Sequence, residues 1–253
     1  RLAKVARARS AAKIAAITGS VGKTGTKEML VQALAPEGET HFSPASFNNH
    51  WGVPLSLARM PASARFGVFE IGMNHAGEIE PLVKMVEPHV AIVTTVEPVH
   101  LEFFDSVEDI ARAKAEIFLG LVPDGVAVIN ADNPHADLLV REATMAGVRR
   151  VVRFGEYRGA EARLDLAKLK PECSCISAEI LGEKVTYKLG APGRHLVQNS
   201  LAVLAAVSLL GGDLAAATLA LGTMTAPKGR GARFRLALPH GGKATLIDES
   251  YNA

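Results

Sequence analysis

Residues 14–34 read IAAITGSVGKTGTKEMLVQAL, and this segment predicts the fold class. It begins with the apolar run Ile14–Thr18, typical of a buried strand, and passes through the glycine-rich turn GSVGKT into a helical stretch from about Thr24 to Leu34. A glycine-rich turn at the start of a helix points backbone N–H groups and the positive end of the helix dipole at phosphate. The segment therefore predicts a phosphate-binding loop between a strand and a helix.

Each residue type in this loop has a physical reason to bind a nucleotide. Gly19 and Gly22 let the backbone approach phosphate closely, Lys23 can reach the β- and γ-phosphates, and the Thr24 hydroxyl can bind Mg²⁺. The full Walker pattern fails because Ile17 stands where its first glycine belongs, so only a shortened GxxGKT remains, and a purely structural turn is the alternative. The predicted nucleotide-binding residues of the loop are Gly19, Ser20, Val21, Gly22, Lys23, Thr24 and Gly25.

The chain as far as residue 155 alternates apolar runs with helical stretches. The predicted strands are Ile14–Thr18, Phe66–Ile71, Val90–Val96, Val126–Asn130 and Val151–Phe154. The predicted helices are Thr24–Leu34, Glu78–Val86, Val107–Leu121 and Pro134–Ala146. Near-continuous apolar strands separated by helices indicate an α/β fold, a mostly parallel sheet with helices on both faces.

The pattern changes after Gly155, where shorter strands follow one another directly. These are Ala162–Leu166, Cys175–Leu181 and Val185–Leu189, and they predict a small antiparallel insertion at about residues 156–190. Two further helices and a terminal hairpin are predicted at Leu196–Leu210, Leu214–Leu221, Phe234–Leu238 and Ala244–Ile247. We expect one central domain over residues 14–247. Residues 1–13 would then be a linker or helix from a preceding domain, and residues 248–253 a junction to a following one.

Composition excludes several classes of protein. Of 253 residues, 48% are hydrophobic and 21% charged, which is ordinary for a globular chain. With 28 basic and 26 acidic side chains the net charge is +2, too balanced for a protein dedicated to nucleic acid. No window approaches the roughly 20 apolar residues of a membrane span. The first thirteen residues superficially resemble a transit peptide, although a solvated helix or linker is favoured, and Cys173 and Cys175 indicate ordinary thiols of a reducing cytoplasm.

Three residues outside the loop are candidates for a metal site. Glu70 closes the strand FGVFEIG, and His100, in VEPVHLEFF, follows the next strand. Carboxyl ends of parallel strands border the crevice where ligands bind. Lys114, in the helical segment ARAKAEIF, cannot ligate a metal as an ammonium, but a neutral amine can react with CO₂ to give a carbamate. The alternatives are a glutamate reaching solvent, a structural histidine and a solvated lysine.

Several motifs in the same order carry a resemblance to a known family. They are TGSVGKTGTKEM, SFNNHWGVPL, FEIGMNHAGEI, HLEFF, AKAEIF, GRHLVQN and DESYNA. Together they resemble the Mur ligases of bacterial peptidoglycan synthesis, over nearly the whole chain from Ile14 to Ala253. The NNxxGVP, ExGxNxxGEI and DESYNA segments are similar to the branch of the family that joins D-alanyl-D-alanine to UDP-N-acetylmuramoyl-tripeptide, rather than to the branches that add single amino acids.

The resemblance implies a fold, a reaction and its partners. Mur ligases have three domains, and this chain looks like the central ATPase domain. ATP phosphorylates the terminal carboxylate of the UDP-N-acetylmuramoyl-tripeptide, and the D-Ala-D-Ala amine attacks the acyl phosphate. The implied cofactors are ATP and Mg²⁺. A cytoplasmic monomer with no nucleic-acid partner is expected. The isolated segment is expected to be inactive, because the flanking domains complete both substrate sites.

The resemblance also implies roles for individual residues. Lys23, His100 and Lys114 are expected to be catalytic. Thr24, Glu70 and His100 would hold metal, and Lys114 matches a lysine that is carbamylated in related ligases and helps to organise a second Mg²⁺. The remaining matches are Asn49 near the γ-phosphate, His195 and Asn199 near adenine, Arg230 at the nucleotide, and either Asp248 or Glu249 at the ribose.

Two other classes of protein remain as alternatives. A P-loop kinase or simple NTPase would carry an Asp after four apolar residues close to the loop, whereas the acid at this strand end is Glu70 within FEIGMNHAG. A non-catalytic nucleotide-binding module would be favoured by loss of Lys23, Glu70 or His100, and all three are present.

Overall fold

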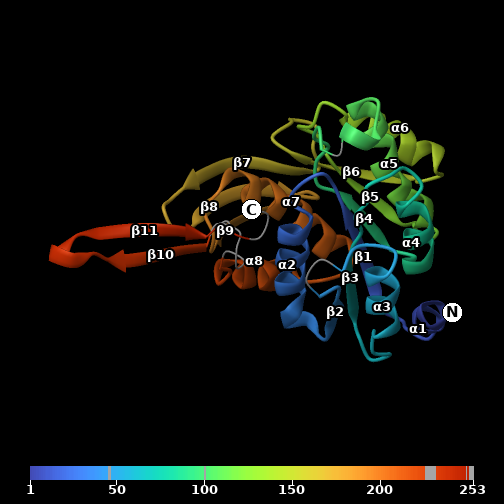
Figure 1. The fold of residues 1–253 in the computed structure, drawn as a ribbon, viewed down its shortest axis with the longest axis horizontal. Coiled ribbons are helices and arrows are strands. Elements are labelled where there is room, and N and C mark those ends of the chain that lie inside the picture. The colour runs from blue at the N-terminus through green and yellow to red at the C-terminus, as the bar shows by residue number, and fades with distance from the viewer. Residues whose placement is uncertain (45–46, 100, 226–231, 249, 251–253) are drawn as a thin grey trace.

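The computed structural model describes residues 1–44, 47–99, 101–225, 232–248 and 250. Its centre is a nine-stranded sheet in the order β2-β3-β1-β4-β5-β6-β7-β8-β9 (Figure 1). The strands are β1 (Lys13–Thr18), β2 (Thr40–Phe42), β3 (Phe66–Glu70), β4 (Val90–Val93), β5 (Val126–Asn130), β6 (Arg150–Gly155), β7 (Ala162–Leu169), β8 (Ser174–Ile180) and β9 (Glu183–Leu189). All pairs from β2 to β7 are parallel. The predicted mostly parallel α/β sheet is confirmed.

Helices cover both faces of this sheet. They are α1 (Leu2–Ala8), α2 (Lys23–Leu34), α3 (Gly52–Ala58), α4 (Ile79–Val86), α5 (Val107–Ala115), α6 (Ala136–Met145), α7 (Arg194–Leu209) and α8 (Leu214–Gly222). Short 3₁₀ helices lie at η1 (Ala35–Glu37), η2 (Leu101–Phe103), η3 (Glu116–Gly120) and η4 (Pro239–Gly241).

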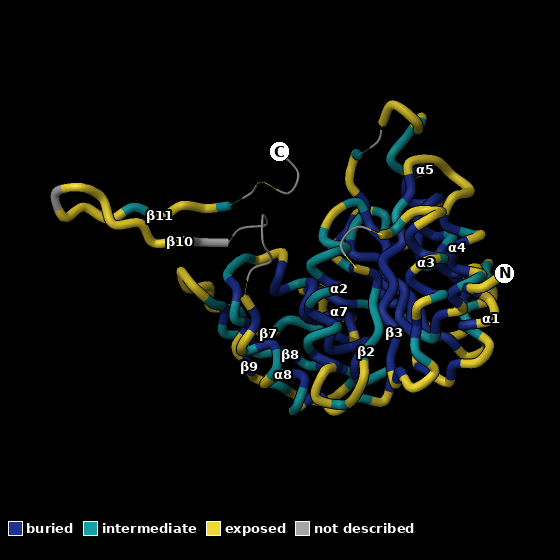
Figure 2. Tube along the Cα trace, turned by 60° about the horizontal axis from the view of Figure 1, so that its bottom comes forward, coloured by how far each residue is buried: buried dark blue, intermediate teal, exposed yellow. Residues whose placement is uncertain are grey.

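Alternate residues of the central strand face two separate cores. Ala15 and Ile17 of β1 belong to the core that contains residues of α2, α7 and α8. Ile14 and Ala16 belong to the other core, which contains residues of α1, α3, α4, α5 and α6. All four side chains are fully buried. This burial on both faces explains why the strand is an unbroken apolar run rather than an alternating one. Figure 2 shows the neighbouring strand β3 coloured as buried.

The three antiparallel strands predicted after Gly155 are confirmed, and they extend the central sheet. β7 pairs in parallel with β6, then in antiparallel fashion with β8, which pairs with β9. The β8–β9 turn consists of Leu181 and Gly182, whose φ angles of 50° and 91° suit a tight hairpin turn with two left-handed residues.

Three elements differ from the sequence-based expectation. β2 and α3 were not predicted, because a three-residue strand and a seven-residue helix leave little periodicity. The single helix predicted over Val107–Leu121 is instead α5 followed by η3, with the change at Glu116.

The predicted terminal hairpin is confirmed and forms a sheet of its own. β10 (Ala232–Ala237) pairs with β11 (Lys243–Asp248), with Phe234 opposite Leu246. It extends away from the main sheet (Figures 1 and 2). At the other end of the chain, the predicted helix within residues 1–13 is α1, which buries Ala3 and Ala6. Within the described part of the chain, no helix has the length and apolar character needed to cross a bilayer.

Candidate active site

The phosphate loop connects the carboxyl end of β1 to α2. Gly22 precedes the helix with φ of 84°, a left-handed conformation that favours glycine, and its carbonyl accepts from the Thr26 N–H at 2.9 Å. The Lys23 ammonium folds back over the loop and donates to the carbonyls of Gly19 at 2.8 Å and Ser20 at 3.3 Å. The loop therefore holds its lysine over its own backbone, at the positive end of α2.

Thr94, next to the end of β4, contacts this loop through a hydrogen bond. Its hydroxyl donates to the Val21 carbonyl at 2.6 Å, and Thr94 itself is 1% exposed. Gly19, with φ of 148°, lies so close that a Cβ there would be 1.9 Å from the Thr94 hydroxyl oxygen. Only glycine fits at this point of the loop. Close packing between the loop and the adjacent strand end is therefore the physical reason for the first glycine.

The Ser20 side chain binds the protein itself. Its hydroxyl donates to the Glu97 carbonyl at 3.1 Å and accepts from the Glu97 N–H at 2.8 Å. The Ser20 N–H also donates to the Thr95 carbonyl at 2.9 Å. These three bonds join the phosphate loop to the segment that leads from β4 towards position 100.

Glu70 meets the loop from the neighbouring strand. β3 lies beside β1 with Glu70 opposite Ile17, so the carboxylate reaches the start of α2. It accepts from the Thr24 hydroxyl at 2.9 Å and from the Asn48 side-chain amide at 2.8 Å, and Glu70 is 1% exposed. A buried carboxylate beside a threonine hydroxyl is a set of oxygen donors that suits Mg²⁺. The structure brings this predicted pair together.

Lys114 lies on α5 and is 2% exposed. Burial, with the positive charge of Lys23 as the second cause, lowers the pKa of Lys114 to about 7. Within the described chain its amine has no hydrogen-bond partner. Near neutral pH a substantial fraction of the Lys114 amine is therefore uncharged.

Asn199 approaches the loop from α7. Asn199 is 7% exposed, and a Cβ on Gly22 would lie 2.8 Å from its side-chain nitrogen. The Asn199 amide forms no hydrogen bond with the described residues, which leaves it free to bind a ligand. Gly25 packs less tightly, since its Cβ would lie 3.9 Å from Leu196, and His195 is exposed in the first turn of α7 beside Gly193.

The remaining predicted site residues bond to other groups of the protein or lie outside the described residues. The Asn49 side-chain oxygen accepts from the backbone N–H groups of Trp51 at 3.1 Å and Gly52 at 2.9 Å, which caps α3. Asp248 ends β11 in the separate hairpin, where its carboxylate accepts from the Ser250 hydroxyl. His100, Arg230 and Glu249 lie outside the described residues.

Sequence reasoning missed several polar residues at this edge. Asn48 reaches Glu70, Thr94 supports the loop, and the Asn130 amide at the end of β5 donates to the Thr94 carbonyl at 3.0 Å. Asn133 donates to the Thr95 hydroxyl at 2.9 Å. Thr94 and Asn130 could have been found from the sequence, because they are polar residues at the carboxyl ends of apolar strands, where ligands bind.

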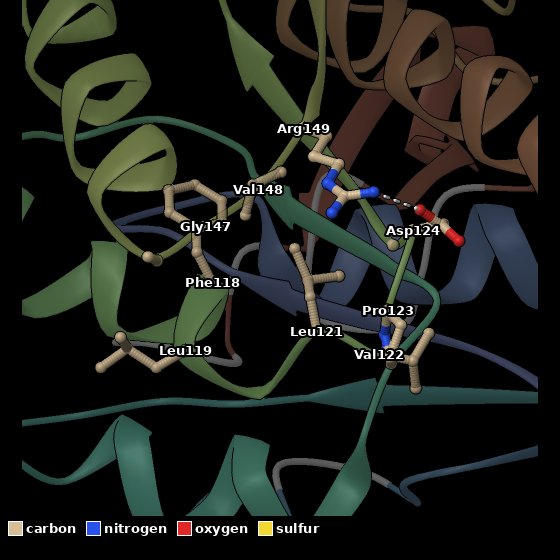
Figure 3. A pocket seen from close by; sticks show the side chains of 11 residues that line it. Phe118, Leu119, Leu121, Val122, Pro123, Asp124, Gly147, Val148 and Arg149 are labelled. Atoms are coloured by element: carbon tan, nitrogen blue, oxygen red, sulfur yellow. Dashed lines mark ion pairs between the residues drawn. The ribbon is translucent and has the colours of Figure 1, made fainter.

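A cavity of about 340 Å³ lies at the opposite edge of the sheet. It is lined by residues just before β5 and β6, among them Val122 and Val148, so it borders the amino ends of these strands. Arg149 and Asp124 form an ion pair of 3.7 Å beside it (Figure 3). Because the phosphate loop lies at the carboxyl ends, this cavity is separate from the candidate site.

The chain is similar in sequence and in fold to known proteins. The chain is 35% identical to the UDP-N-acetylmuramoyl-tripeptide–D-alanyl-D-alanine ligase of Escherichia coli, over 96% of this chain and 52% of that protein. It superimposes on the crystal structure of MurF from Acinetobacter baumannii with a TM-score of 0.91 and 32% identity, covering 100% of this chain and 54% of the other. For MurF ligase from Thermotoga maritima in complex with ADP, the TM-score is 0.83 at 26% identity, with 100% and 57% covered.

The chain thus spans about half the length of the relatives it matches. The profile of the Mur ligase middle domain matches residues 17–207, which include the phosphate loop, Glu70, Lys114 and Asn199. This chain belongs to the Mur ligase family.

Proposed function

We propose that this chain forms the ATP- and Mg²⁺-binding centre of a ligase that joins D-alanyl-D-alanine to UDP-N-acetylmuramoyl-tripeptide. The proposal is supported by relatives of that name at 30–35% identity and by the likeness to MurF structures, one of them in complex with ADP. The observation that carries it is the 2.9 Å bond from the Thr24 hydroxyl to Glu70 beside a lysine-bearing phosphate loop.

The proposed chemistry is phosphoryl transfer followed by amide formation. Lys23 and the N–H groups at the start of α2 would hold the phosphates, while Thr24 and Glu70 would hold Mg²⁺, which would neutralise phosphate charge. The tripeptide carboxylate takes the γ-phosphoryl group of ATP and ADP leaves. The D-Ala-D-Ala amine then attacks the acyl carbon, phosphate leaves with the electron pair of the C–O bond, and the amine loses one proton.

We also propose that Lys114 is carbamylated. Its amine is buried and forms no hydrogen bond with the described residues, and its lowered pKa provides the neutral form that attacks CO₂. The new C–N bond gives a carbamate and one proton is released. The product exchanges a positive charge for a negative one beside Lys23, which suits a site that must also hold Mg²⁺.

Further roles follow from the same proposal. His100 would complete the metal site, Asn49 would lie near the γ-phosphate, and His195 and Asn199 would contact adenine. Arg230 and one of Asp248 and Glu249 would contact the nucleotide. We propose residues 14–247 as the central domain, with residues 1–13 and 248–253 as connections to neighbouring domains, and a cytoplasmic monomer.

The test uses the full-length protein that contains this chain, with Lys23→Ala against Lys84→Ala. Lys84 is an exposed residue of α4 that pairs with Glu80. Amide product and ADP release are measured with ATP, UDP-N-acetylmuramoyl-tripeptide and D-Ala-D-Ala. Lys23→Ala should abolish both while Lys84→Ala leaves both unchanged. ADP release that needs neither peptide substrate would favour a simple NTPase, and near-normal turnover in Lys23→Ala would overturn the phosphate-loop assignment.

A further inference from the structure

Glu116 lies two residues after Lys114 and binds a different helix. It follows the last residue of α5, and its carboxylate accepts from three backbone N–H groups at the beginning of α4. The donors are Gly77 at 2.6 Å, Ile79 at 3.1 Å and Glu80 at 3.1 Å. A negative charge here also meets the positive end of the α4 dipole.

α4 has no local substitute for this cap. The residue at its N-cap position, Glu78, makes no side-chain bond to the first turn of the helix. Its carboxylate instead accepts from the Asn74 N–H at 2.7 Å and lies 3.2 Å from the His75 ring. The first N–H groups of a helix have no hydrogen-bond acceptors within that helix. For α4 the acceptor is the Glu116 carboxylate, which is 36 or more residues away in the sequence.

A second contact joins the same two elements. A Cβ on Gly120, the last residue of η3, would lie 2.4 Å from the backbone carbon of Val83 in α4. The last residue of η3 therefore packs directly against the α4 backbone. Glu116, the first residue of η3, binds the first turn of α4. Two contacts, one polar and one steric, hold α5–η3 and α4 in one arrangement.

Each of the two elements is connected along the chain to a residue of the proposed metal site. α4 is joined to the end of β3, and hence to Glu70, by residues 71–78. α5 carries Lys114. Any movement of α5–η3 along α4 would move the Lys114 amine relative to the Glu70 carboxylate. If Lys114 and Glu70 act on the same cation, the distance between their side chains must be fixed.

We propose that Glu116 is a positioning residue for the reaction. By capping α4 it sets the place of Lys114 relative to Glu70 and the phosphate loop. This inference rests on the proposed function, because it assigns Glu116 a part in that site without contact to substrate or cofactor.

The test compares Glu116→Gln with the unchanged full-length protein and with Glu80→Gln. The Gln side chain keeps the size of Glu116 but loses the charge. The control removes an exposed carboxylate on the same helix, which pairs with Lys84 at 2.6 Å. Hydrogen exchange of the Gly77, Ile79 and Glu80 amides should accelerate about tenfold in Glu116→Gln, in the range expected for a charge at a helix terminus. Glu80→Gln removes a first-turn charge but no acceptor of these N–H groups, so it should accelerate their exchange much less than Glu116→Gln does.

Two further readouts separate positioning from simple stabilisation. Labelling of Lys114 by an amine-reactive reagent, followed by peptide mass spectrometry, should be faster in Glu116→Gln at a temperature where the variant is fully folded. The kcat of ligation should fall at least about tenfold while the KM for ATP stays within about twofold, because the phosphate loop is untouched.

Three outcomes would overturn the inference. Unchanged exchange would show that the cap does not form. Faster exchange with unchanged Lys114 labelling and unchanged kcat would show a merely structural cap, and loss of stability equal to that of Glu80→Gln with no other difference would do the same. If the unchanged protein has no ligase activity, the proposed function fails, and the exchange and labelling measurements still decide whether Glu116 positions Lys114.

Discussion

Replacing Gly22 by alanine tests the contact between the phosphate loop and α7. The φ angle of 84° at Gly22 costs an L-residue roughly 1–2 kcal/mol. The new Cβ would also lie 2.8 Å from the Asn199 side-chain nitrogen. Moving that amide off its preferred rotamer adds about 1 kcal/mol. We therefore expect Gly22→Ala to lower the free energy of unfolding by about 2–3 kcal/mol.

The chain offers a matched control at Gly147. Its φ is 85°, almost the same as at Gly22, and nothing lies within 4 Å of the position of its Cβ. Gly147→Ala therefore measures the backbone cost alone, which we expect to be about 1–2 kcal/mol. The difference between the two variants gives the cost of the contact with Asn199.

A double-mutant cycle assigns that difference to one pair of residues. In an Asn199→Ala background, Gly22→Ala should cost only as much as Gly147→Ala, which gives a coupling of about 1 kcal/mol. The assay is urea unfolding without nucleotide, with midpoints compared at constant m-value. Additive effects, or equal costs for Gly22→Ala and Gly147→Ala, would refute the contact between α7 and the loop.

Three other substitutions address the remaining contacts of the site and of β1. Thr94→Val removes the hydroxyl that holds the Val21 carbonyl at 2.6 Å, so the KM for ATP should rise about tenfold in steady-state kinetics, whereas Thr94→Ser should restore it. Glu70→Gln keeps an acceptor for Thr24 but removes the negative charge. The Mg²⁺ concentration for half-maximal activity should therefore rise at least about tenfold, and an unchanged Mg²⁺ titration would contradict the metal assignment. Burial, aided by the charges of Lys13 and Arg7, lowers the pKa of His89 to about 4, and the ring accepts from the Ile14 N–H at 3.0 Å. As the pH falls, His89 therefore becomes protonated at a higher pH in the unfolded chain than in the folded chain. The stability from the neutral ring is complete above pH 6.5 and is lost as the pH falls towards 4, by about 1–2 kcal/mol once solvent screening is allowed for. His89→Gln should flatten this part of the stability profile in urea unfolding, and an unaltered profile would assign the pH dependence to other groups.

The parallel sheet could be predicted because its signals are local. Apolar runs such as Val126–Asn130, helical periodicity and turn residues are properties of neighbouring residues, and each element buries its own side chains. The phosphate loop could be predicted for the same reason, because the apolar strand and the GSVGKT turn are contiguous in the sequence. Glu70 could be predicted from its place at a strand end, where the sheet topology determines what it faces.

The contacts that organise the site could not be predicted in this way. Nothing near Glu116 in the sequence indicates that its carboxylate binds N–H groups at positions 77–80. Asn48 and Asn49 are adjacent and identical, yet one reaches Glu70 and the other caps α3. The change from α5 to η3 is equally invisible in a helical pattern that continues to Leu121.

The local chain thus specified strands, helices, the glycine-rich turn and the kinds of side chain available for chemistry, because backbone preference and hydrophobic period act over a few residues. Which of those side chains meet was decided by packing between segments far apart in the sequence, as with Thr24 and Glu70, Val21 and Thr94, or Gly22 and Asn199. Hydrogen bonds depend on angstrom-scale placement. That placement exists only after the sheet has been ordered and both of its faces covered.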